Sequence, residues 1–102
     1  MAREIFELSQ GFPKEERYSL TDQMRRSSRS IGAQVAEAWG KRRSEMHFIL
    51  KLTDAEAEQL ETQHWLEVCS ESGYIDNDTG ERLLNKCESI GKMIHSMIDK
   101  SS

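Results

Sequence analysis

The sequence is poor in residues that interrupt or avoid helices. Its 102 residues include one proline and six glycines, and no stretch alternates apolar β-branched residues with polar ones. Such alternation is typical of a half-buried strand, so no strand is predicted. A chain of this length supports one hydrophobic core rather than two. We therefore predict a single all-α domain spanning residues 1–102.

Cysteines and long apolar runs are also scarce. The two cysteines, Cys69 and Cys87, each lie on the apolar stripe of a predicted helix. That position favours two buried thiols, with a disulfide as the alternative. No stretch of 18 apolar residues and no export signal is present, so neither a membrane span nor secretion is expected. These absences predict a cytoplasmic protein.

Basic residues are outnumbered, 14 against 18, and the net charge of −4 argues against a general nucleic-acid coat. The charge is unevenly distributed. Residues 14–43 hold eight basic and four acidic residues, a net of +4, whereas residues 44–83 hold two basic and ten acidic residues, a net of −8. Two such surfaces suit either pairing between neighbouring subunits or the binding of a partner.

Apolar periodicity predicts four helices, over residues of about 1–10, 20–42, 44–72 and 79–99. The short connections between them favour antiparallel neighbours, so we predict an antiparallel up-down-up-down four-helix bundle. No capping residue precedes the first helix, which is therefore expected to be short at its front end.

Several residues have the character of helix caps. The pairs Ser19–Asp22 and Asp78–Glu81 have capping-box spacing, and Ser44 is placed to cap the third helix. Gly73 fits the left-handed position that commonly ends a helix.

The second predicted helix has a thin core-facing seam. Several of its members are small or polar: Leu20, Met24, Ser27, Ile31, Gln34, Val35 and Ala38. Small seam residues bury little apolar area but let a neighbouring helix approach closely. Gly32 and Gly91 are interpreted in the same way, as close-packing points within helices.

The far side of this helix is basic. It carries Arg25, Arg26 and Arg29, and the helix ends in the run Lys41, Arg42 and Arg43. Basic residues at that end suit the negative end of the helix dipole. The arginines are interpreted either as a solvated face or as a face that binds a partner.

The third helix has two apolar faces. One follows Phe48, Leu52, Ala55, Gln59, Thr62, Leu66 and Cys69, and the other follows Ile49, Leu50, Ala57, Leu60 and Val68. A helix in a lone bundle needs one such face, so the second is predicted to meet another subunit. Trp39 and Trp65 flank their helices at positions that suit interface anchors, with a place at the bundle edge as the alternative.

No arrangement of residues indicates catalysis. His47, His64 and His95 lack metal-ligand spacing to one another or to a cysteine, and no base is placed to activate Cys69 or Cys87. No glycine-rich phosphate loop is present. We therefore predict no catalytic, cofactor-binding or metal site, and no small-molecule substrate.

The stretch from Tyr18 to Arg43 resembles a family signature, and the match extends to residues on either side. In register are Phe12, Pro13, Glu16, Tyr18, Leu20, Gln23, Arg25, Arg26, Ser30, Ile31, Ala36 and Glu37, and later Phe48, Leu60-Glu61-Thr62-Gln63 and Gly73-Tyr74. This pattern is similar to that of the 23S rRNA-intervening-sequence proteins, which are small bacterial four-helix bundles. The chain departs from the usual residues at Ser27, Gln34, Val35 and Ala38.

The resemblance implies a bundle that assembles as a ring, typically a homopentamer, with no enzymatic activity. It also implies a basic surface, since some relatives are accessory proteins of retroelements that contact nucleic acid and a reverse transcriptase. Our first hypothesis is an oligomer that binds RNA or a nucleic-acid enzyme through the six basic residues of the second helix and its exit. The alternative is a purely structural module in which the basic second helix pairs with the acidic third helix of a neighbour.

Overall fold

The computed structural model describes residues 1–101, and every regular element in that range is helical. The elements are α1 (Ala2–Ser9), a 3₁₀ turn (Lys14–Glu16), a π-helical turn (Arg17–Thr21), α2 (Asp22–Gly40), α3 (Glu45–Glu71) and α4 (Asn77–Ser101). The prediction of an all-α fold with four helices is confirmed. No helix within residues 1–101 combines the length and the apolar character that crossing a membrane requires.

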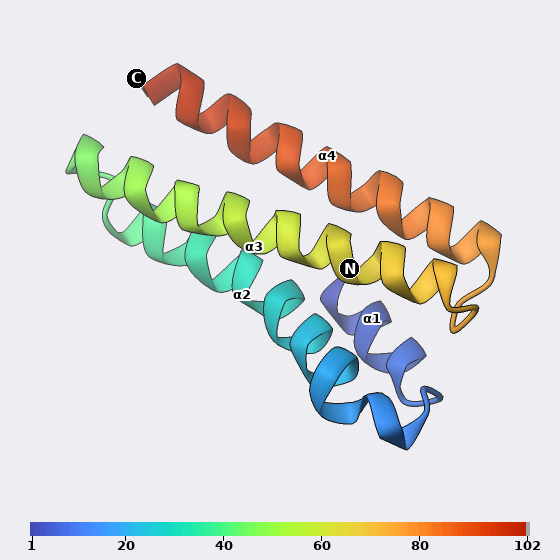
Figure 1. Ribbon diagram of the computed structural model, residues 1–102. Coiled ribbons are helices and arrows are strands. Elements are labelled where there is room, and N and C mark those ends of the chain that lie inside the picture. Colours follow the sequence, from blue (N-terminus) through green and yellow to red (C-terminus); the bar gives the residue numbers. More distant parts are fainter. Residues whose placement is uncertain (102) are drawn as a thin grey trace.

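The central helix is α3. It packs along α2 on one side and along α4 on the other (Figure 1). The short helix α1 has 8 residues against 27 in α3, so it covers one end of the molecule only. Because the three long helices set the shape, the molecule is elongated, at 44 × 23 × 17 Å.

The core divides into two apolar clusters along this length. The cluster at the α1 end contains Ile5, Leu20, Met24, Leu66, Cys69, Ile75, Leu83 and Cys87. The cluster at the other end contains Ile31, Ala38, Leu52, Ala55 and Ile94. All of these are buried, and those from the second and third predicted helices belong to the predicted seams. The seams were therefore predicted well, because burial imposes the helical period on the sequence.

Polar side chains complete the packing around α3. The hydroxyl oxygens of Thr62 and Ser27 are 2.9 Å apart and form a buried hydrogen bond to α2. On the α4 side, Nε2 of Gln59 donates to the backbone oxygen of Cys87 at 3.1 Å. A Cβ added at Gly91 would lie 2.7 Å from the end of the Gln59 side chain, so a larger residue here would force that side chain to shift.

The two glycines that were interpreted as close-packing points have different environments. The interpretation of Gly91 as a close-packing point is confirmed. The same interpretation of Gly32 is wrong, because Gly32 is exposed and a Cβ there would meet nothing within 4 Å.

The caps around α3 match the prediction. Oγ of Ser44 accepts from the backbone N–H of His47 at 3.4 Å. Gly73 has a φ of 74°, and the N–H of Tyr74 donates to the oxygen of Cys69 at 3.0 Å. The first bond satisfies a backbone N–H at the start of α3, and the second satisfies a carbonyl at its end, and neither group has a partner within the helix.

The two predicted capping boxes are wrong. Ser19 lies inside the π-helical turn that leads into α2, and its hydroxyl donates to Glu16 at 2.9 Å. The helix α4 begins at Asn77, and Oδ1 of Asp76 accepts from the N–H of Thr79 at 2.7 Å. In both places the helical backbone starts earlier than the capping-box spacing indicated.

Candidate interaction surfaces

Arg26 is bound to α3 of its own chain. Its Nη1 lies 2.8 Å from Oε2 of Glu58, and its Nη2 lies 2.6 Å from Oε2 of Glu61. These hydrogen bonds raise the pKa of the guanidinium. Because two carboxylates share one guanidinium, the charge of Arg26 is already neutralised within the subunit.

Glu61 also fixes a tryptophan. Nε1 of Trp65 donates to Oε2 of Glu61 at 3.1 Å. Burial opposes ionisation of Glu61, but the hydrogen bonds from Trp65 and Arg26 outweigh it and lower the pKa of this carboxyl. Glu61 is therefore ionised at neutral pH and holds residues of both α2 and α3.

Arg25 and Arg29 face α1 instead. Their guanidinium carbons lie 4.4 Å and 5.2 Å from the ring centroid of Phe6, within the range of a cation–π contact. Nε of Arg25 also donates to the hydroxyl of Ser9 at 2.7 Å. The arginine side of α2 is therefore a packing face for α1 and α3 as well as a charged surface.

The basic turn, defined as Lys41, Arg42 and Arg43, lies exposed between α2 and α3. Arg42 donates from Nη1 to the backbone oxygen of Trp39 at 2.9 Å, and its guanidinium lies 4.4 Å from the Trp39 ring centroid. No residue of the basic turn forms an ion pair with a carboxylate within residues 1–101.

The nearby acid Glu37 pairs with a lysine outside the basic turn. Oε2 of Glu37 lies 2.7 Å from Nζ of Lys51, and this hydrogen bond lowers the pKa of Glu37. The side chain of Trp39 is 63% exposed. The three cations of the basic turn therefore lie next to an exposed aromatic ring.

The outer face of α3 exposes apolar side chains. Leu50 is 55% exposed, Leu60 is 58% exposed, and Ala57 lies between them on the same exposed line. These three belong to the predicted subunit interface. Met46 extends the line by one turn and is 63% exposed, although sequence reasoning missed it because it lies in the capped first turn. Its spacing of four residues from Leu50 is the signal that could have found it.

Other members of the predicted interface contact the core of their own subunit. Trp65 and Val68 are half-buried and pack against the cluster at the α1 end. Ile49 is also half-buried. Trp39 is the exposed tryptophan, so it is the one of the two whose ring is available to a partner.

The thiols are buried and unpaired, which confirms one prediction and makes the alternative of a disulfide wrong. Burial raises the pKa of the Cys69 thiol to about 11 and also raises that of Cys87. Both thiols are therefore protonated at neutral pH and are poor nucleophiles. Within residues 1–101 no group of three His, Cys, Asp or Glu residues is arranged to hold a metal ion.

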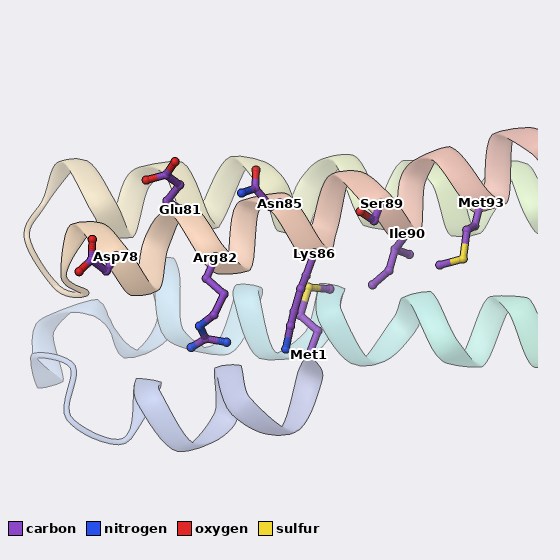
Figure 2. A pocket seen from close by; sticks show the side chains of 9 residues that line it. All are labelled: Met1, Asp78, Glu81, Arg82, Asn85, Lys86, Ser89, Ile90 and Met93. Atoms are coloured by element: carbon purple, nitrogen blue, oxygen red, sulfur yellow. The ribbon is translucent and has the colours of Figure 1, made fainter.

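A shallow groove of about 700 Å³ runs along α4. Figure 2 shows its lining residues, which all lie on α4 apart from Met1. Arg82 and Lys86 point from α4 toward α1, and both form ion pairs with Glu4. Since its basic residues hold α1 in place, this groove does not offer a charged binding site.

Comparison with known proteins gives a family and a fold. The profile of the 23S rRNA-intervening sequence protein family matches residues 1–96. A crystal structure from Bacteroides thetaiotaomicron, described as a protein of unknown function from the S23 ribosomal protein family, superposes with a TM-score of 0.84. It is 34% identical, and the match covers 95% of this chain and 90% of that one. No match was found among proteins with curated functions. The chain belongs to the 23S rRNA-intervening sequence protein family.

Proposed function

We propose that the protein is a non-enzymatic, self-associating helical bundle of the cytoplasm that binds single-stranded RNA through the basic turn. The observation that carries the proposal is a contrast among the six basic residues of α2 and the turn after it. Arg26 is neutralised by Glu58 and Glu61, whereas the basic turn is exposed and has no carboxylate partner within residues 1–101.

Trp39 strengthens this proposal. Nucleic acid without base pairing is bound by positive grooves that follow the phosphates and by aromatic rings on which bases stack. The basic turn supplies positive charge and the neighbouring Trp39 supplies a ring, with the Arg42 guanidinium over it. Each phosphate contact to a single strand contributes about 0.7 to the slope of log affinity against log salt, so three contacts give a slope of roughly 2 per subunit.

One subunit has a net charge of −4 and a single basic turn, and self-association would bring several basic turns together. We propose antiparallel up-down-up-down bundles arranged in a ring, a homopentamer by family resemblance. Its contacts use the apolar outer face of α3, which exposes Leu50 and Leu60. An exposed apolar patch of this kind marks an interaction site. Repetition of the basic turn around a ring raises avidity without any new contact.

The test is RNA binding by a charge-reversed turn. The triple variant Lys41→Glu, Arg42→Glu and Arg43→Glu should lose about 100-fold in affinity at low salt, because three charge-assisted contacts become repulsive. Its matched control reverses three scattered, exposed lysines, Lys14, Lys92 and Lys100, and reaches the same net charge. Fluorescence anisotropy of a labelled single strand measures both. Equal losses in the two variants, or no binding by the parent protein, would contradict the proposal.

The second candidate is a purely structural module, favoured by the exposed apolar face of α3. The acidic partners of Arg26 lie in its own subunit, so in this version the contacts between subunits are mainly apolar. Leu60→Glu should reduce the mass measured by light scattering toward the 11.8 kDa of one chain, whereas Ser89→Glu on exposed α4 surface should not. An assembled parent that binds no RNA would favour this candidate over the first.

A further inference from the structure

A cleft between α1 and the first half of α2 contains an unusual pair of arginines. It has a volume of about 480 Å³, and its lining includes Phe6 of α1 and Asp22, Arg25, Arg26 and Arg29 of α2. Three of these side chains are cations, and Asp22 is the acidic one. The cleft lies at the opposite end of α2 from the basic turn.

The arginine pair shares one aromatic ring. The guanidinium groups of Arg25 and Arg29 lie 4.4 Å and 5.2 Å from the centroid of Phe6. Ser9 accepts a hydrogen bond from Nε of Arg25 at 2.7 Å. The stacking and this bond hold Arg25 in one orientation, so less rotamer freedom is lost when its remaining N–H groups bind a ligand.

Neither arginine of the pair is neutralised by the protein. Within residues 1–101 no carboxylate forms an ion pair with Arg25 or Arg29, in contrast to Arg26 beside them with its two carboxylates. Two like charges over one ring repel each other, and an anion between them would remove that repulsion.

We propose that Arg25 and Arg29 form a binding site for a phosphate group. Guanidinium forks present paired N–H donors that match the oxygens of a phosphate, and a doubly charged anion suits two such forks better than a single carboxylate does. An adjoining hollow of about 280 Å³, lined by Ala2, Arg3, Phe6 and Arg29, leaves room for a larger group attached to the phosphate. The charge of Arg3 is shared with Glu7, 3.4 Å away.

This site is independent of the proposed RNA contact at the basic turn. Two sources supply the same chemistry, free phosphate and the terminal phosphate of an oligonucleotide. A terminal phosphate would place part of its nucleotide in the adjoining hollow, whereas free phosphate would not fill it.

The experiment is calorimetric titration of the parent protein with inorganic phosphate at constant ionic strength, with chloride as the reference salt. Arg29→Gln should weaken phosphate binding about tenfold, since it removes charge-assisted hydrogen bonds. Lys92→Gln removes the same charge at an exposed position of α4 and should leave phosphate binding unchanged. Arg29 is exposed and its contact is the Phe6 ring, so this variant tests the site without removing the bond between Arg25 and Ser9.

A second arm compares a short oligonucleotide with and without a 5′-phosphate, using the triple reversal of the basic turn as the protein. Competition of the phosphorylated form alone against inorganic phosphate identifies a terminal phosphate as the source. If neither oligonucleotide competes and inorganic phosphate still binds, free phosphate is identified as the source. The proposal is overturned if phosphate binds no better than chloride or if Arg29→Gln binds it as tightly as the parent.

Discussion

The first half of α2 and the turn that ends it each carry three basic residues, but their surroundings differ. Arg26 is held by Glu58 and Glu61 of α3, and Arg25 and Arg29 lie over Phe6 of α1. The basic turn is exposed, and its Arg42 lies over the Trp39 ring. The comparison teaches that equal formal charge can serve the fold at one end of a helix and remain available to a partner at the other.

The sharpest test of this comparison reverses one charge in each region. Arg26→Glu places a third carboxylate beside Glu58 and Glu61, and we expect it to lower the free energy of unfolding by about 2 kcal/mol, a value limited by the exposure of Arg26. Arg43→Glu should change it by less than about 0.5 kcal/mol, as is usual for exposed surface positions. Urea denaturation followed by circular dichroism measures both. Equal costs would abolish the distinction between the two regions.

A smaller contrast is expected for the two arginines that stack on aromatic rings. Arg25→Ala removes a stack on half-buried Phe6 and the bond to Ser9, so it should cost about 1 kcal/mol of stability. Arg42→Ala removes a stack on exposed Trp39 and should cost only about 0.3 kcal/mol. Thermal unfolding of the two variants gives the comparison. A larger loss for Arg42→Ala would mean that the basic turn stabilises the fold.

The smallest expected effect is on the pH dependence of stability. The pKa of Glu61 is lowered from its ordinary value of 4.5, so its contribution is present above that pH and is lost as the pH falls through the folded-state pKa. Arg26→Gln removes one of its donors, so its stability should fall less steeply than that of the parent between about pH 5 and pH 3. Arg43→Gln should follow the parent. Denaturation curves at several pH values would refute this if all three proteins had the same slope.

The fold could be predicted from the sequence because its helices are amphipathic. Buried residues such as Leu52, Leu66 and Leu83 recur with the helical period, and that period is visible in the chain. The glycine Gly32 shows the limit. A glycine in a helix shows only that a side chain is absent. Whether another helix packs closely there depends on contacts between segments far apart in the sequence.

The candidate site was less predictable, because it also depends on contacts between segments far apart in the sequence. Periodicity placed Arg25 and Arg26 on the side of α2 away from the core. It did not identify the residues that these arginines contact. The partners of Arg26 are 32 and 35 residues further along the chain, and they are brought to it by the register between α2 and α3. The basic turn was easier to identify because exposure at a helix end needs no distant partner.

The most direct test of the central claim observes the arginine side chains themselves. The Nε–H signals of Arg26, Arg42 and Arg43 can be followed by nuclear magnetic resonance as single-stranded RNA is added to the parent protein. The signals of Arg42 and Arg43 should shift with saturation, while that of Arg26 should stay in place because Glu58 and Glu61 already occupy it. A shift of Arg26 without any change at Arg42 and Arg43 would contradict the account.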